Sequence, residues 1–169
     1  MDYRSLIRDI PDYPKPGIVF KDLTGIWKDP DAHRASARDI ADHFRESGIT
    51  KVAAAEARGF ITGSLVAAEL GAGFLPVRKP GKLPWETISE SYELEYGTDT
   101  LEMHVDAVNR GDRVLLVDDL VATGGTLAAI VRMIRRQGGE AVGVGTLVSL
   151  DFLKPESKLD IPVFALVRC

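Results

Sequence analysis

The chain has 169 residues, of which 45% are hydrophobic and 27% charged, a balance typical of one globular domain rather than of a disordered or fibrous chain. Its net charge of −4 argues against a dedicated nucleic-acid binder, and neither a signal peptide nor a membrane span is expected, because the start is polar and no apolar run approaches about 18 residues. The single cysteine, Cys169, excludes an internal disulfide and a cysteine zinc site and indicates a reducing, cytoplasmic compartment.

The first 30 residues are predicted to form an irregular arm. Residues 5–10 have the pattern of a short helix that Pro11 would end. Three prolines within residues 11–17 exclude a helix or a central strand there, and the short apolar run Ile18–Phe20 follows. A helix is then predicted from Asp29 to about Ser47, closed by Gly48.

After Gly48, short apolar segments alternate with helical ones. Strands are predicted at 51–55, 73–77, 113–117, 141–147 and 163–167, with a further candidate at 101–105, and helices at 62–70 and 126–137. This alternation predicts a single α/β domain over residues 1–169, with a doubly wound, mostly parallel sheet flanked by helices. The polar segment 80–98 is longer than an ordinary connection of about 2–6 residues and is expected to be a flexible, functional loop.

The most informative segment is Val114–Thr126, with the sequence VLLVDDLVATGGT. A buried strand is predicted to end in Asp118 and Asp119, and small residues then lead into a helix. Their backbone N–H groups, the threonine hydroxyls and the positive end of the helix dipole can converge on one phosphate; these residues are Ala122, Thr123, Gly124, Gly125 and Thr126. The two carboxylates suit sugar hydroxyls or a hydrated Mg²⁺. The alternative is a plain strand end followed by a helix cap.

Cationic side chains are grouped at two places in this acidic chain. Arg58 follows a predicted strand, and Arg78, Lys79 and Lys82 lie in a turn fixed by Pro80, Gly81 and Pro84. Arginine and lysine match the oxygens of a diphosphate, although a solvated basic surface is the alternative. Phe20 could stack on a planar ring or instead belong to a core strand.

The Val114–Thr126 segment resembles the phosphoribosyl-diphosphate motif of the type I phosphoribosyltransferases. Further segments, in the same order along the chain, are similar to the adenine-specific members of that family: residues 13–22 (YPKPGIVFKD), 56–60 (EARGF), 77–84 (VRKPGKLP) and 92–97 (YELEYG). The resemblance covers roughly residues 10–153. It implies transfer of a 5-phosphoribosyl group from 5-phosphoribosyl 1-diphosphate to adenine, giving AMP and diphosphate, in purine salvage.

The resemblance also implies roles for individual residues. Residues 1–30 would form a hood over the base, with backbone groups of Val19 and Lys21 reading the adenine edge, Phe20 on one face and Leu150 on the other. Arg58 would hold the diphosphate, with help from Arg78, Lys79 and Lys82. Glu95 would be the general acid/base candidate, with Glu93 as an ordinary loop charge. Mg²⁺, a homodimer and a non-proline cis peptide near Glu56-Ala57 are further implications. The rivals are a sibling enzyme for orotate, xanthine or hypoxanthine and a non-catalytic sensor.

Overall fold

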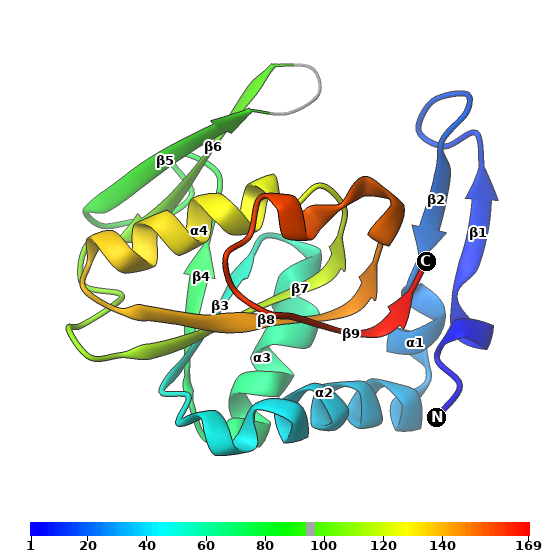
Figure 1. Ribbon diagram of the computed structural model, residues 1–169, viewed down its shortest axis with the longest axis horizontal. Coiled ribbons are helices and arrows are strands. Elements are labelled where there is room, and N and C mark those ends of the chain that lie inside the picture. Colours follow the sequence, from blue (N-terminus) through cyan, green and yellow to red (C-terminus); the bar gives the residue numbers. More distant parts are fainter. Residues whose placement is uncertain (94–96) are drawn as a thin grey trace.

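A computed structural model describes residues 1–93 and 97–169 (Figure 1). Its centre is a parallel sheet with the strand order β4 (Gly73–Val77), β3 (Lys51–Ala55), β7 (Arg113–Val121), β8 (Glu140–Ser149) and β9 (Val163–Arg168). Strand β7 lies in the middle, and its residues 114–117 are fully buried. A strand buried on both faces requires the uninterrupted apolar sequence VLLV.

Helices cover both faces of this sheet (Figure 1). On one face, α2 (Pro30–Phe44) and α3 (Arg58–Leu70) pack on Leu115 and Val117, and on the other α4 (Gly125–Arg136) packs on Val114 and Leu116. Alternate side chains of a strand point to opposite faces, so β7 contributes to both cores. The predicted doubly wound α/β fold is confirmed.

Two antiparallel hairpins flank the central sheet (Figure 1). Strand β1 (Arg8–Pro11) pairs with β2 (Val19–Asp22), and β5 (Thr87–Glu93) pairs with β6 (Thr98–His104) beside α4. The remaining short elements are η1 (Arg4–Leu6), α1 (Thr24–Lys28), η2 (Arg45–Ser47), η3 (Asp151–Leu153) and η4 (Pro155–Ser157). Within the described ranges, no helix has both the length and the apolar character needed to cross a membrane.

Several predicted boundaries were wrong. The short helix predicted at 5–10 is a single 3-10 turn followed by β1, because residues 8–11 pair with β2. The predicted loop 80–98 contains the whole of β5, a mostly polar strand on a hairpin outside the main sheet. Strand β7 continues beyond Val117 to Val121, so the two aspartates lie within a strand that still pairs with β8.

Candidate active site

A cavity of about 330 Å³ opens at the carboxyl ends of β3 and β7, where parallel α/β sheets usually bind ligands. It brings together five residues that the sequence predicts as functional, and the hairpin β5–β6 closes one side of it. The predicted residues lining it are Arg58, Lys79, Asp118, Asp119 and Thr126, and the others include Glu56, Tyr92 and Asp99.

The carboxylates of Asp118 and Asp119 form the floor of this cavity. Asp119 is only 3% exposed, and its Oδ2 lies 2.9 Å from Nε of Arg58. Burial raises the pKa of Asp118 well above the usual carboxyl value, and the charge of Asp119 raises that pKa further. Burial also raises the pKa of Asp119, against the opposing effect of Arg58. The protein therefore holds two carboxylates that favour a cation or hydroxyl donors as ligands.

Close backbone packing brings α3 against these carboxylates. A Cβ atom added to Gly59 would lie 2.9 Å from Oδ1 of Asp118, so only glycine allows this approach of the first turn of α3. The peptide between Glu56 and Ala57, which leads into the same turn, is cis, in agreement with the family pattern.

The segment from Ala122 to Thr126 forms a tight turn into α4. Gly124 has a φ of 79°, and a Cβ there would lie 2.8 Å from the carbonyl oxygen of Pro155. Among the residues that the structure describes, the backbone amides of 122–127 donate no hydrogen bonds. Consecutive free amides at the start of a helix are the usual arrangement for holding a phosphate.

Two residues that the sequence analysis missed link the cation Lys79 to this turn. The ammonium group of Lys79 pairs with Asp99, and the hydroxyl of Tyr92 donates to Asp99 Oδ2 over 3.1 Å. The Thr126 hydroxyl in turn donates to the Tyr92 hydroxyl over 3.2 Å. Tyr92 and Asp99 are opposite each other in the β5–β6 register. That pairing could have been found only if residues 87–93 had been predicted as a strand.

The other two predicted cations, Arg78 and Lys82, are not among the residues lining the cavity. Arg78 donates to Oε2 of Glu56 and to the carbonyl of Lys82, both over 3.0 Å. Glu56 also accepts from the amide of Lys79 over 2.6 Å. Glu56, for which the sequence predicted no role of its own, thus fixes the turn that presents Lys79.

The predicted base-binding residues belong to two separate parts of the fold. Phe20, on β2, lies under the guanidinium of Arg58, with 5.2 Å between Cζ and the ring centre. The Lys21 side chain pairs with Asp9 over 2.7 Å, and the two residues are opposite each other in the β1–β2 register. Val19 is exposed, and Leu150 is half-buried at the end of β8, where its amide donates to Val121.

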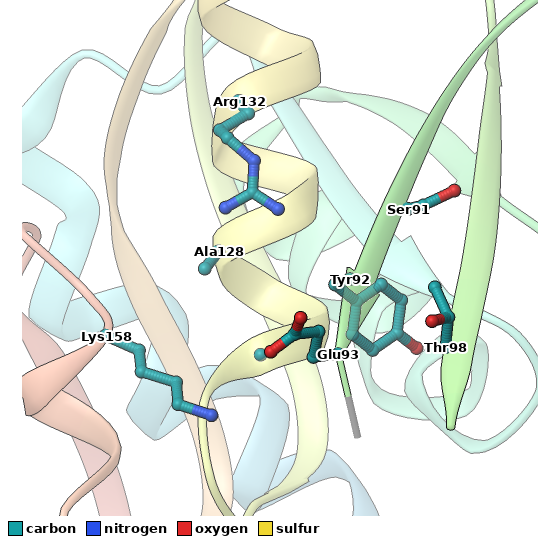
Figure 2. A pocket seen from close by; sticks show the side chains of 8 residues that line it. Ser91, Tyr92, Glu93, Thr98, Ala128, Arg132 and Lys158 are labelled. Carbon is teal, nitrogen blue, oxygen red and sulfur yellow. The ribbon is translucent and has the colours of Figure 1, made fainter. Parts of the chain in front are cut away.

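A second pocket, of about 510 Å³, lies on the far side of Tyr92, between β5 and α4 (Figure 2). Figure 2 shows the side chains of Arg132, Lys158 and Glu93 around this pocket, and Arg132 pairs with Glu90 over 2.6 Å. Glu93 lines this second pocket and not the cavity that contains Asp118 and Asp119. Glu95, the predicted acid/base residue, lies outside the described residues.

Comparison with known proteins places this geometry in a family. The sequence model of the phosphoribosyl transferase domain family matches residues 26–165 of this chain. The adenine phosphoribosyltransferase of Yersinia pestis is 58% identical over 156 residues, which is 92% of this chain and 83% of that protein.

Solved structures agree with this result. The adenine phosphoribosyltransferase of Thermoanaerobacter pseudethanolicus has a TM-score of 0.96 and 47% identity, over 99% of this chain and 98% of that one. The enzyme of Saccharomyces cerevisiae, solved with D-2,5-dideoxy-2,5-imino-altritol 1,6-bisphosphate and adenine, has a TM-score of 0.93 and 36% identity, over 98% of this chain and 96% of that one. The chain therefore belongs to the phosphoribosyltransferase family and, within it, to the adenine phosphoribosyltransferases, which transfer a 5-phosphoribosyl group to adenine.

Proposed function

We propose that the 122–126 turn holds the 5-phosphate of 5-phosphoribosyl 1-diphosphate while the sugar lies across Asp118 and Asp119. The observation that carries this assignment is that the backbone amides at 122–127 donate no hydrogen bond to any residue that the structure describes, close to the carboxylates of Asp118 and Asp119. A phosphate needs donors and a ribose needs acceptors. Thr126 lines the cavity that contains the two carboxylates, while Gly125, the residue before it, lines the neighbouring pocket on the far side of Tyr92.

The diphosphate would lie toward Arg58 and Lys79, which both line the same cavity. As the bond from the sugar C1 to the diphosphate breaks, negative charge builds on the leaving group and the ring gains oxocarbenium character. Fixed cations that face the leaving oxygens stabilise this charge separation. Arg78 fixes the turn through Glu56, and we propose that Lys82, with Arg78, acts on a diphosphate either in this subunit or in a neighbouring one.

Phosphoribosyltransferases generally use Mg²⁺ with 5-phosphoribosyl 1-diphosphate. Across residues 1–93 and 97–169, no set of three acidic, histidine or cysteine side chains could hold a metal ion. The carboxylates of Asp118 and Asp119 fit an ion that takes its remaining oxygens from substrate and water. Mg²⁺ would supply charge neutralisation of the leaving diphosphate there.

Adenine would lie between Phe20 and Leu150, under the hood formed by residues 1–30. A backbone carbonyl of Val19 would accept from the 6-amino group, and the Lys21 amide would donate to N1. Hypoxanthine and guanine carry a 6-oxo acceptor and a protonated N1, so like groups would face each other, at a cost of about 1–3 kcal/mol for each unpaired group. The adenine bound in the Saccharomyces cerevisiae relative supports this choice of base.

Further parts of the proposal follow from the family and the sequence. We propose that the chain is one catalytic domain, acts as a homodimer in the cytoplasm, and uses Glu95 to move a proton at the base. The single thiol, Cys169, suits a reducing compartment. The products would be AMP and diphosphate.

The test is turnover of 5-phosphoribosyl 1-diphosphate with adenine, hypoxanthine, xanthine and orotate, each in separate reactions. We expect AMP from adenine and little product from the other bases. No turnover with adenine would overturn the proposal. A crystal structure with AMP adds a geometric test, since its phosphate should lie on the amides of 122–127.

A Glu95→Gln variant distinguishes an enzyme from a non-catalytic sensor of the sugar diphosphate. Removing a general acid/base typically costs about 10²–10⁴-fold in rate. We expect kcat to fall by at least tenfold while AMP still binds. Glu93→Gln is the matched control, because Glu93 lines the other pocket.

A further inference from the structure

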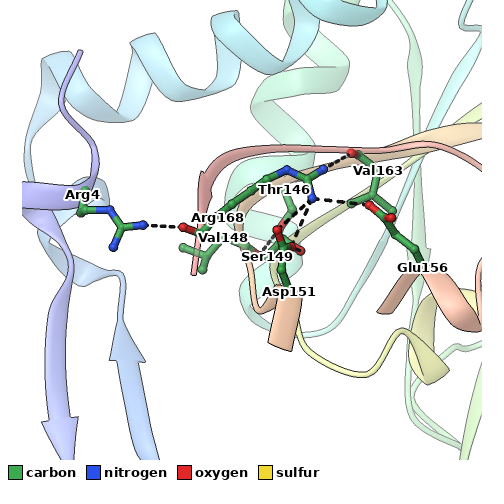
Figure 3. A network of polar contacts seen from close by, with 8 residues as sticks. All are labelled: Arg4, Thr146, Val148, Ser149, Asp151, Glu156, Val163 and Arg168. Carbon is green, nitrogen blue, oxygen red and sulfur yellow. Dashed lines mark hydrogen bonds and ion pairs between the residues drawn. The ribbon is translucent and has the colours of Figure 1, made fainter. Parts of the chain in front are cut away.

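Arg168, the last residue of β9, is the centre of a polar network at the end of the chain (Figure 3). Its Nη1 lies 3.1 and 3.2 Å from the two carboxylate oxygens of Asp151, and its Nη2 donates to the carbonyl of Val163 over 2.7 Å. A weaker contact of 3.4 Å joins Nη1 to Glu156. One guanidinium thus joins β9 to the segment that follows β8.

Asp151 directly follows Leu150, the residue assigned to one face of the base. The amide of Asp151 donates to the carbonyl of Cys169 over 2.8 Å, and Oδ1 of Asp151 accepts from the buried hydroxyl of Ser149 over 2.7 Å. The amide of Leu150 donates to Val121 over 2.9 Å. The turn is therefore held to β7 on one side and to the last two residues of the chain on the other.

The hood is attached at the same place. The guanidinium of Arg4, in η1, donates to the backbone carbonyl of Arg168 (Figure 3). Two residues after η1 the chain enters β1, which pairs with β2, the strand of Phe20. A small cavity of about 100 Å³ at this junction is lined by Arg4, Lys21 and Cys169, among others. The strand of Phe20 and the turn of Leu150, the two sides of the assigned base site, are thus both connected by hydrogen bonds to Arg168 and Cys169.

We propose that Arg168 is a positioning residue for adenine: its side chain fixes the Leu150 turn, and its backbone carbonyl fixes the hood, so that both sides of the assigned base site keep their positions. This inference rests on the proposed function, because it takes Phe20 and Leu150 as the two walls of the base site. It predicts a selective effect, since Arg168 contacts neither the carboxylates of β7 nor the turn at 122–126.

The test compares AMP with ribose 5-phosphate, which lacks the base, by calorimetric titration of the full-length protein. Arg168 is 44% exposed in its side chain, so its removal should cost little folding stability. In Arg168→Gln we expect AMP to bind about fivefold more weakly, on the scale of one exposed ion pair, and ribose 5-phosphate to bind within twofold of the wild type. In turnover, KM for adenine should rise with kcat little changed.

Three further variants make the test specific. Arg168→Lys keeps the charge beside Asp151 and should restore most of the AMP affinity. Asp151→Asn should show the same selective loss, and adding it to Arg168→Gln should have no further effect, because both remove one interaction. Arg45→Gln is the matched control, since Arg45 is 47% exposed and pairs with Asp42 on α2.

Equal weakening of AMP and ribose 5-phosphate in Arg168→Gln would overturn the inference, and so would unchanged binding of both. A wild-type protein that bound AMP no better than ribose 5-phosphate would instead overturn the proposed base site, and the inference with it. Because the wild-type result is read first, the two failures are distinguishable.

Discussion

Lys79 and Asp99 form an ion pair inside the cavity that we assign to 5-phosphoribosyl 1-diphosphate. Asp99 also accepts from Tyr92, whose hydroxyl accepts from Thr126 in the phosphate turn. A cation and a hydroxyl that we assign to substrate thus have partners on the β5–β6 hairpin. Substrate must replace these partners, and the free energy of breaking their contacts lowers its affinity.

Removing the carboxylate of Asp99 should therefore strengthen the binding of diphosphate. Burial raises the pKa of Asp99, but the hydrogen bond from Lys79 and further contacts outweigh this effect and hold that pKa below its usual value. This carboxylate is therefore ionised at neutral pH. In Asp99→Asn we expect the Kd for diphosphate, measured by calorimetry, to fall about fivefold, the equivalent of roughly 1 kcal/mol. Asp106→Asn, a charge change at an exposed site, is the control and should have no effect. Weaker binding in Asp99→Asn would show that Asp99 supports Lys79 rather than competes with substrate.

Arg58 has contacts to both halves of the assigned site. Its guanidinium lies over the ring of Phe20, and its Nε is 2.9 Å from Asp119. Lysine keeps the charge but loses the planar fork that can hold two oxygens at once. We expect Arg58→Lys to lower kcat/KM for 5-phosphoribosyl 1-diphosphate by about 100-fold, the loss of an interaction of roughly 2.7 kcal/mol in the transition state.

The control for this variant is Arg38→Lys, an exposed arginine on α2. It should leave steady-state kinetics unchanged. An Arg58→Lys enzyme with wild-type kcat/KM would contradict the assignment of Arg58 to the leaving group.

Part of this site follows from the sequence, and part depends on pairing between distant strands. The strands at 51–55 and 73–77 were predicted to the residue, because each short apolar run is bounded by a glycine or a charged residue. The turn at 122–126, which we assign to the phosphate, was predicted as a turn because its glycines and threonines are consecutive. Tyr92 and Asp99 were missed because β5 buries only Tyr92 of its seven residues, so the strand lacks an apolar pattern. Their proximity comes from the hairpin register alone.

Asp118 gives a prediction in which stability and activity change in opposite directions. Its raised pKa means that the ionised carboxylate is less favourable in the folded protein than in the unfolded chain. This penalty is complete above the raised pKa, shrinks as the pH falls through it, and is absent below the usual carboxyl pKa. Asp118→Asn should therefore melt at a higher temperature than the wild type at pH 8, by a few degrees, and the difference should diminish in acid.

The same variant should lose activity, because an amide neither balances a cation nor accepts from two sugar hydroxyls as well as a carboxylate does. Melting curves from pH 4 to 8, recorded with turnover assays, check both parts. Asp112→Asn is the contrasting control. Burial raises the pKa of Asp112, but the hydrogen bond from Lys51 and further contacts outweigh this effect and hold that pKa below its usual value. The contribution of Asp112 to stability is therefore present above the usual carboxyl pKa and is lost in acid. Its replacement should lower the melting temperature at pH 8.

Gly124 allows a test of the phosphate turn that leaves every polar side chain in place. Its φ of 79° disfavours any other residue, and an added Cβ would lie 2.8 Å from the Pro155 carbonyl oxygen. Gly71, with a φ of 65° at the end of α3, has no atom within 4 Å of an added Cβ. Alanine at either position costs about 1 kcal/mol for the left-handed backbone, but only Gly124→Ala must also displace the turn.

Both alanine variants should thus melt at a lower temperature, and only Gly124→Ala should lose ligand affinity. Because a shift of even 1 Å misaligns several amides from one phosphate, we expect ribose 5-phosphate to bind at least tenfold more weakly to Gly124→Ala and normally to Gly71→Ala. Titration calorimetry with melting curves separates the two effects. Normal affinity in a folded Gly124→Ala protein would mean that the phosphate is held elsewhere, since the amides at 122–127 cannot keep their positions around the added methyl group.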